Sequence, residues 1–219
     1  MLERHIQLLR VERPVADETA AAARARLADK FPRAALRRMT HLGLLTGAVL
    51  DGVALGAEDA MVYASSFAET RALEDFLSSF PAASPLLFQT SIHPSAIQQV
   101  LIGRQQPVGR FWPMTGRKRL VESALLAALM EPAPRVVLVG GEERGTWLRE
   151  QQMASDEAFA FGLLLTTAPT GARGRIRFEP VPGLDDEPCP TLPDFGQALT
   201  GRTARHWRGA GGNWSVEFT

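Results

Sequence analysis

The sequence has a single cysteine, Cys189, so an intrachain disulfide and any metal site built from cysteine pairs are excluded. It also lacks an uninterrupted apolar run of about 18 residues, the length that spans a bilayer. The first residues, Met1 to Arg13, lack the apolar core of a secretory signal peptide. We therefore expect a cytoplasmic protein without disulfides or a membrane span.

The sequence also has no excess of either charge, because its 24 Lys and Arg residues are balanced by 24 Asp and Glu residues. A formal net charge of zero gives no global attraction for nucleic acid, and no nucleic-acid partner is expected. With 45% hydrophobic and 22% charged residues, the 219-residue chain has enough apolar side chain for a packed core. The composition predicts one folded domain of ordinary size.

Histidine is scarce as well, with four residues and no His-x3-His or His-Glu-x-x-His spacing, so neither a metal site nor a cofactor is predicted. His93 lies between two predicted helices, where it is either a structural, hydrogen-bonded histidine or a catalytic base. With Ser66 or Ser91 it could serve a stand-alone acyl-thioester transferase or hydrolase. No Gly-x-Ser-x-Gly motif supports such an enzyme.

Two further segments are candidate binding sites. The turn Gly140 to Gly145 follows a predicted strand and could hold an anion in a small-molecule or coenzyme A-binding module, although Glu142 and Glu143 occupy the place of the anion. Arg117 and Lys118 open a predicted helix, where the dipole also favours anions. They form either a site for a phosphate or an acidic carrier, or a solvated basic turn.

Hydrophobic periodicity predicts alternating strands and helices. The predicted helices are 33–50, 70–80, 95–101 and 119–130, and the predicted strands are 59–65, 111–114, 135–140, 159–167 and 174–179. The last two strands are expected to form a hairpin around 169–171. This order predicts an α/β fold with helices on both sides of a mixed five-stranded sheet.

Arg33, Arg37 and Arg38 lie at the start of the first predicted helix, where the helix dipole disfavours cations. Either a group outside the helix compensates them or they form a solvated face.

From Pro180 onward, proline and glycine become frequent, which predicts an irregular C-terminal extension (180–219) that packs on the main domain (1–179). Only Asn213 to Phe218 has the pattern of a strand. The extension has more large apolar residues than a solvated linker, namely Leu184, Leu192, Phe195, Leu199, Trp207, Trp214, Val216 and Phe218.

Several segments resemble, in order, the β-ketoacyl synthase-like N-terminal domain family. They are Pro32-Arg-Ala-Ala-Leu-Arg-Arg-Met39, Val62-Tyr-Ala-Ser-Ser66 with Glu69, Ser84-Pro-Leu-Leu-Phe-Gln-Thr-Ser-Ile-His93, Gly109, the small-residue helix from Leu120, and Val136-Val-Leu-Val-Gly140. Pro94 departs from the asparagine that is usual after the histidine. The resemblance covers about residues 32–167 and implies a single thiolase-like half-domain.

The resemblance also implies which catalytic groups are missing. Ketosynthases carry a cysteine at the tip of the helix that corresponds to 119–130, and take both catalytic histidines from a second half-domain. Here the tip is Gly116, Arg117, Lys118 and Arg119, and the second half is absent. The resemblance therefore implies a degenerate nucleophile region with no catalytic residue.

Degenerate ketosynthase-like subunits act by pairing with an active ketosynthase, and the short form is similar to proteins of aryl polyene pathways. The resemblance thus implies a noncatalytic partner or scaffold in fatty acid, polyketide or aryl polyene type biosynthesis. We expect a homodimer, or a heterodimer with a ketosynthase, through an edge strand anchored by Phe111 and Trp112. An acyl carrier protein is a further candidate partner.

Overall fold

The computed structural model describes residues 1–15, 17–182, 187–209 and 211–219. The strands are β1 (Leu2–Glu12), β2 (Ala60–Ser65), β3 (Arg110–Thr115), β4 (Arg135–Glu142), β5 (Phe159–Thr166), β6 (Gly174–Pro180), β7 (Arg205–Gly209) and β8 (Gly212–Phe218). The α-helices are α1 (Ala20–Arg26), α2 (Arg33–Leu36), α3 (His41–Val49), α4 (Thr70–Ser78), α5 (Pro85–Ser91), α6 (Ser95–Arg104), α7 (Leu120–Met130) and α8 (Leu192–Gly201). Short 3-10 turns occur at Ala28–Lys30 and Leu148–Gln151.

In the described part of the chain, eight strands form one mixed sheet in the order β3-β2-β4-β5-β1-β6-β8-β7. β2 is parallel to β3 and β4, and the other neighbours are antiparallel. The predicted α/β class with a mixed sheet is confirmed. The sheet has eight strands where five were predicted, because β1, β7 and β8 join the five predicted strands; β8 corresponds to Asn213 to Phe218, which had the pattern of a strand.

The position of β1 contradicts the predicted hairpin of β5 and β6. β1 lies between these two strands, pairing His5 with Thr166 of β5 and Leu2 with Phe178 of β6. The segment 169–171 therefore connects strands that are not neighbours. Sequence spacing could not reveal this insertion, because β1 pairs with residues 148 or more positions away in the chain.

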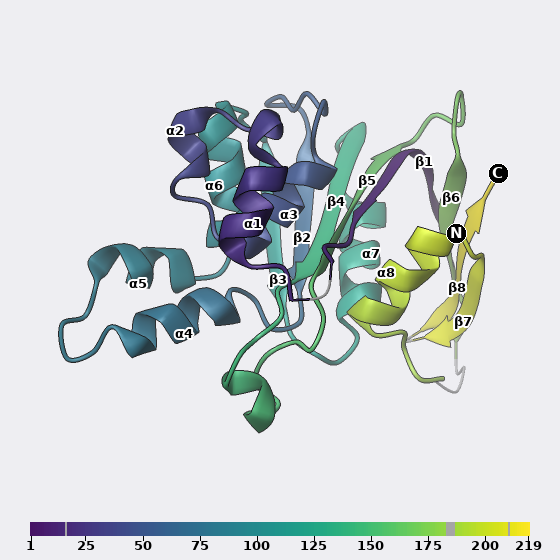
Figure 1. Ribbon diagram of the computed structural model, residues 1–219. Coiled ribbons are helices and arrows are strands. Elements are labelled where there is room, and N and C mark those ends of the chain that lie inside the picture. The colour runs from purple at the N-terminus through teal and green to yellow at the C-terminus, as the bar shows by residue number, and fades with distance from the viewer. Residues whose placement is uncertain (16, 183–186, 210) are drawn as a thin grey trace.

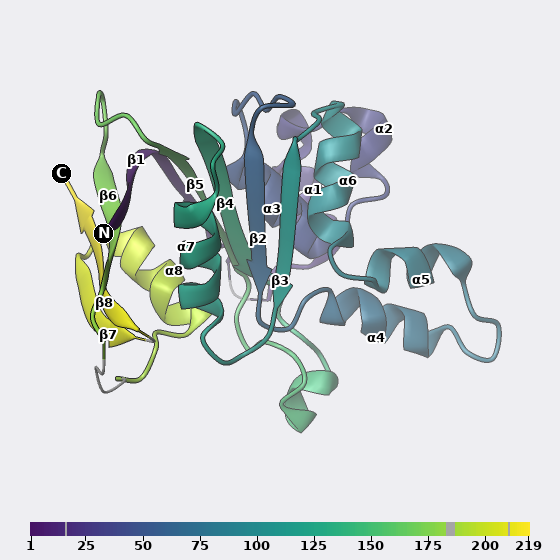
Figure 2. The ribbon, with the colours of Figure 1, turned by 180° about the vertical axis from the view of Figure 1, so that it is seen from behind.

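Helices cover both faces of the sheet, as predicted (Figures 1 and 2). α1, α2, α3 and α6 lie on one face, and α7 and α8 lie on the other. The predicted helix 33–50 is two helices, because Thr40 starts α3 by accepting a hydrogen bond from the Gly43 N–H at 3.0 Å. α3 is buried along its whole length and forms the centre of one hydrophobic core.

The C-terminal residues, expected to be irregular, form regular structure. Thr191 and Asp194 make a capping box that begins α8, and β8 and β7 extend the sheet beyond β6. Phe195, Trp207 and Trp214 are buried in the same core as α7. Leu184 lies outside the described residues.

α4 and α5 form an arm that projects past the β3 side of the sheet (Figure 2). The rings of Phe80 and Phe88 pack on Phe76 at centroid distances of 5.4 and 5.3 Å. Phe80, Leu86, Phe88 and Ile92 are nevertheless largely exposed. We call residues 70–92 the α4–α5 arm.

Candidate functional site

The candidate site lies where β2, β3 and β4 end, because the carboxyl ends of parallel strands meet at one edge of a sheet. β3 leads into the turn Gly116–Arg119, and Arg119 begins α7 in a left-handed conformation with φ 55°. The Arg117 guanidinium lies 5.4 Å from the centre of the Phe67 ring, in the loop that follows β2. The turn thus packs beside Ser66, and two of the predicted segments come together.

The turn itself offers cations and no nucleophile. Arg117, Lys118 and Arg119 are exposed, and Arg119 forms an ion pair with Glu122 at 3.7 Å. The indole N–H of Trp207 donates to the same buried carboxylate at 3.0 Å. A side chain of the C-terminal extension is therefore fixed to the first turn of α7.

Cys189 also lies near this helix start, which the sequence analysis did not anticipate. It is half-buried and packs against the core beneath α7. Burial raises the pKa of the thiol, partly offset by the backbone N–H of Glu122. A thiol is therefore present beside α7, but its environment disfavours the reactive thiolate.

His93 is held in place on two sides. Its Nδ1 lies 3.1 Å from a carboxylate oxygen of the buried Glu69, and its ring stacks on Tyr63 at 5.2 Å. The other oxygen of Glu69 accepts the Ala96 N–H at the start of α6. The Nε2 atom of His93 is buried without a hydrogen-bond partner among the described residues.

The structure does not connect His93 to either candidate serine. The Ser66 backbone and hydroxyl bond to Glu142, and the Ser91 hydroxyl donates to the Phe88 carbonyl at 2.8 Å. No hydrogen bond joins these hydroxyls to His93 in the described ranges. The arrangement lacks the nucleophile–base contact of an acyl-transfer site.

Glu142 and Glu143, at the end of β4, are buried carboxylates whose role the sequence analysis missed. Glu142 accepts from Ser65, Ser66 and Phe67, and Glu143 accepts from the N–H groups of Leu42, Arg71 and Ala72. Burial raises the pKa of each carboxyl to about 7. A signal was present, since two consecutive acids ended an apolar strand.

These contacts explain how the turn 140–145 is used. The N–H groups at the starts of α3 and α4, which could have held an anion, already donate to Glu143. The Thr146 and Leu148 N–H groups donate likewise to Glu74. The protein's own carboxylates therefore take the donors of the anion site considered for this turn.

β3 forms one edge of the described sheet. The two interface anchors predicted on it, Phe111 and Trp112, differ in exposure. Trp112 is 47% exposed and its indole N–H donates to Glu131 at 2.9 Å. Phe111 is partly buried and packs against the α3 core. Of the two side chains, Trp112 is thus the more available to another molecule.

Among the described residues, no group of histidine, cysteine and acidic side chains has a metal-binding arrangement. In the same part of the chain, no helix is both long and apolar enough to cross a bilayer.

No protein-family model matches the sequence. No curated protein matches it either. Among solved structures, a chain of the complex of the ketosynthase ApeO with its chain length factor ApeC, from Xenorhabdus doucetiae, superposes with a TM-score of 0.66. This match has 18% identity and covers 99% of this chain and 100% of that chain. The ishigamide ketosynthase/chain length factor superposes with a TM-score of 0.56 and 12% identity, over 82% of this chain and 68% of that chain. The chain therefore has the ketosynthase-like thiolase fold.

Proposed function

We propose that the chain is a noncatalytic ketosynthase-like subunit that assembles with an active ketosynthase in polyketide, fatty acid or aryl polyene type biosynthesis. The turn Gly116–Arg119 carries this proposal, because it has no thiol or hydroxyl where the family resemblance places the nucleophile. The fold is shared with a chain from a complex of a ketosynthase with its chain length factor. That similarity supports the same kind of assembly here.

The β3 edge is the surface that we assign to the partner. The opposite edge, β7, has five residues, among them the exposed cations Arg205 and Arg208, which discourage pairing with another strand. β3 instead presents Trp112, and the apolar α4–α5 arm projects on the same side (Figure 2). An open edge flanked by exposed aromatic and aliphatic side chains favours a protein interface.

Co-expression with a ketosynthase from the same organism, followed by native mass spectrometry, tests the assembly. We expect a heterodimer that Trp112→Glu weakens, because a carboxylate would be buried at the interface. His206→Glu is the matched control, since His206 is an exposed aromatic residue on β7, at the opposite edge of the described sheet. The proposal is contradicted if the chain stays monomeric in the presence of the ketosynthase, or if the two variants weaken the heterodimer equally.

Incubation with an acyl carrier protein loaded with an acyl thioester tests the absence of catalysis. We expect no mass increase on the chain and no thioester turnover, because the turn at α7 cannot form an acyl-enzyme. Turnover that is lost in His93→Ala would instead support the acyl-thioester transferase or hydrolase. A thermal shift with coenzyme A alone would support the binding module.

A further inference from the structure

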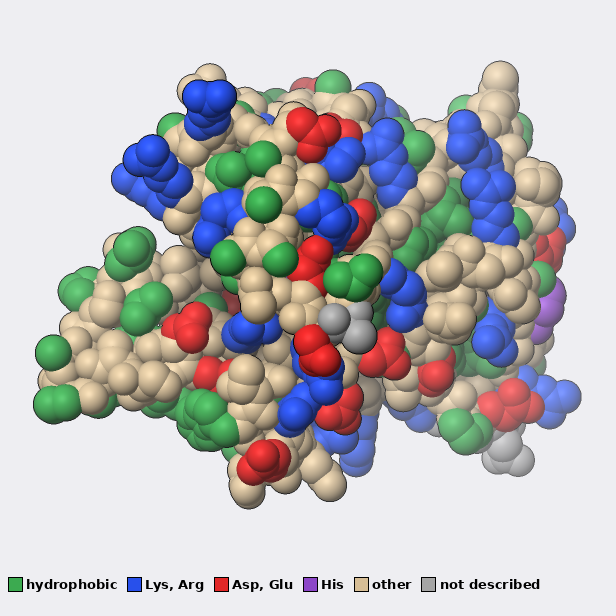
Figure 3. All heavy atoms as spheres, viewed as in Figure 1, with side chains coloured by type: hydrophobic (Ala, Val, Ile, Leu, Met, Phe, Trp, Pro, Cys, Tyr) green, Lys and Arg blue, Asp and Glu red, His purple; other side chains and the backbone are tan. Residues whose placement is uncertain are grey.

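Two adjoining cavities form a groove away from the turn at α7. The inner one is lined by α1, the residues between α2 and α3, α4 and α5, and the outer one lies between α2 and the α5–α6 pair. The inner cavity has a volume of about 200 Å³ and the outer cavity about 600 Å³. They share Arg38, Leu86 and Thr90, so one space leads into the other. Figure 3 shows cationic side chains gathered above the projecting arm, with hydrophobic side chains along the arm itself.

The inner cavity is cationic. Its lining includes Arg24, Arg37, Arg38 and Arg71, against the acids Asp75 and Glu143. Arg24 donates to the carbonyls of Leu36 and Met39, which leaves its charge uncompensated. In the part of the chain that the structure describes, Arg37, Arg38 and Arg71 make no side-chain hydrogen bond or ion pair. The Glu143 carboxylate already accepts hydrogen bonds from backbone N–H groups of α3 and α4.

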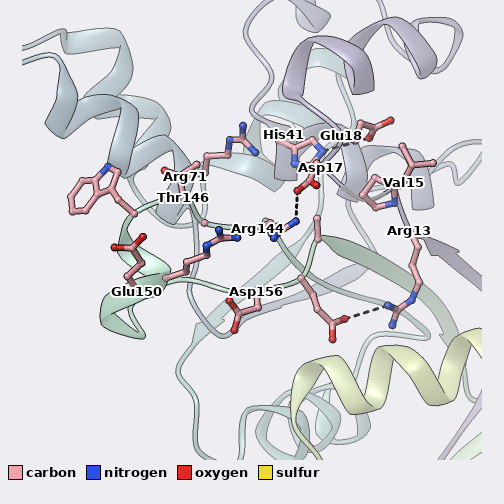
Figure 4. A pocket seen from close by; sticks show the side chains of 16 residues that line it. Arg13, Val15, Asp17, Glu18, His41, Arg71, Arg144, Thr146, Glu150 and Asp156 are labelled. Atoms are coloured by element: carbon pink, nitrogen blue, oxygen red, sulfur yellow. Dashed lines mark hydrogen bonds and ion pairs between the residues drawn. The ribbon is translucent and has the colours of Figure 1, made fainter.

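His41 is an independent sign that the inner cavity holds a ligand. Its side chain is 2% exposed, yet Nδ1 has no hydrogen-bond partner among the described residues, and Nε2 has only a long contact with a carboxylate. The closest acid, Glu18, is 3.6 Å from Nε2 and is bonded to Arg26. Buried polar groups in folded proteins are nearly always paired. His41 and Arg71 also line a further cavity of about 570 Å³, where Figure 4 shows both side chains.

The outer cavity is suited to an apolar group. Leu86 and Ile102 line it and are 56% and 76% exposed. Pro32, Ala34 and Ala35 of the α2 region form the facing wall, and Gln89, Gln98 and Gln99 line the cavity from α5 and α6. Exposed aliphatic side chains beside a cationic pocket favour an amphipathic ligand.

We propose that this groove binds an organic anion with one carboxylate or phosphate group and an aliphatic tail. The head group lies among Arg38, Arg71 and His41, where guanidinium groups bind oxyanions through charged hydrogen bonds. The tail lies along Leu86 and Ile102. The groove includes neither the β3 edge nor the turn at α7, but it shares Arg71, Leu86 and Thr90 with the α4–α5 arm. Its test uses the chain alone, so the result does not depend on assembly with a ketosynthase.

Titration of the full chain with octyl phosphate, followed by isothermal calorimetry, tests the proposal. Inorganic phosphate tests the head group alone, and octyltrimethylammonium tests the tail with the opposite charge. We expect saturable binding of octyl phosphate, at least about tenfold weaker binding of inorganic phosphate, and no binding of the ammonium compound.

Arg38→Gln, at an exposed position, should weaken octyl phosphate binding about tenfold or more, and so should Arg71→Gln. Arg33→Gln is the matched control, since Arg33 is an exposed arginine at the start of α2, near Arg38 in the chain, and lines neither cavity. Leu86→Ser should weaken octyl phosphate without changing inorganic phosphate. No binding of octyl phosphate at millimolar concentration, or equal losses in the Arg33 and Arg38 variants, overturns the proposal.

Discussion

Glu142 and Glu143 are buried carboxylates that accept backbone hydrogen bonds which an anionic ligand could otherwise accept. Their carboxylates bind the loop after β2 and the first turns of α3 and α4, so three segments are joined at the end of β4. The two consecutive acids could be noticed in the sequence, but their burial could not. It depends on which helices start above β4, and that is set by packing over long distances in the chain.

The raised pKa of Glu143 predicts a pH dependence of stability. Its carboxyl, with an ordinary pKa of 4.5, titrates at about 7 when folded, so it binds a proton more tightly in the folded chain. The free energy of unfolding should therefore fall as pH rises from about 4.5 to about 7, by on the order of a few kcal/mol at most. Urea unfolding of Glu143→Gln across this range should show a shallower fall.

Titration of His41 has the opposite effect on the free energy of unfolding. Burial and then the charge of Arg71 lower its pKa below 6.5, so its contribution to stability increases as pH rises. The comparison between variants is therefore the informative measurement. Glu150→Gln, on an exposed turn, should keep the wild-type pH dependence. If the Glu143 variant keeps it as well, the raised pKa is wrong.

Cys189 should react slowly with alkylating agents. Burial raises the pKa of its thiol, so less thiolate is present near neutral pH than for a free cysteine. We expect iodoacetamide to modify the folded protein at least about tenfold more slowly than the same protein in urea. Equal rates in the two conditions, followed by mass spectrometry, would falsify this assignment.

At the level of helices and strands, local patterns predicted the parallel part of the sheet well. The runs that became β2, β3 and β4 are short apolar segments followed by helices or turns, and their boundaries are near the predicted ones. β1 was missed and the β5–β6 hairpin was wrong, because strand order depends on contacts between distant residues. The candidate site followed the same rule. The structure brings Ser66 beside the α7 turn, which the sequence offered as separate candidates, and the partner of His93 is Glu69 and not a serine.

The break between α2 and α3 predicts a measurable capping energy. Thr40 accepts the Gly43 N–H at the start of α3, a buried helix on which one core is built. Thr40→Ala should lower the free energy of unfolding by about 1 kcal/mol. Thr170→Ala, in an exposed turn, is the matched control and should change it by less than about 0.5 kcal/mol. Urea unfolding of both variants checks the difference.

For the whole molecule, the C-terminal extension should be needed for stability. Removal of residues 180–219 would expose the α7 face now covered by α8 and would leave the Glu122 carboxylate without the Trp207 indole. We expect aggregation or a strongly lowered melting temperature, because each exposed Å² of apolar surface costs about 25 cal/mol.

Trp207→Phe gives a milder test of the same contact. It keeps an aromatic ring, though a smaller one, and removes the donor, so the variant should fold with the free energy of unfolding reduced by about 1–3 kcal/mol. Trp147→Phe serves as control, because Trp147 is exposed and does not contact Glu122. A truncated chain that melts like the full chain would show that the extension is dispensable.

The position of β1 between β5 and β6 also constrains the order in which the strands can pair during synthesis of the chain. Translation proceeds at roughly 5–20 residues per second, so roughly ten to thirty seconds separate the synthesis of His5 from that of its partner Thr166. During that time β1 has neither neighbour, although β2, β3 and β4 can already pair. The sheet should therefore be assembled first at its parallel end, and the middle strand should be inserted only when β5 and β6 have left the ribosome.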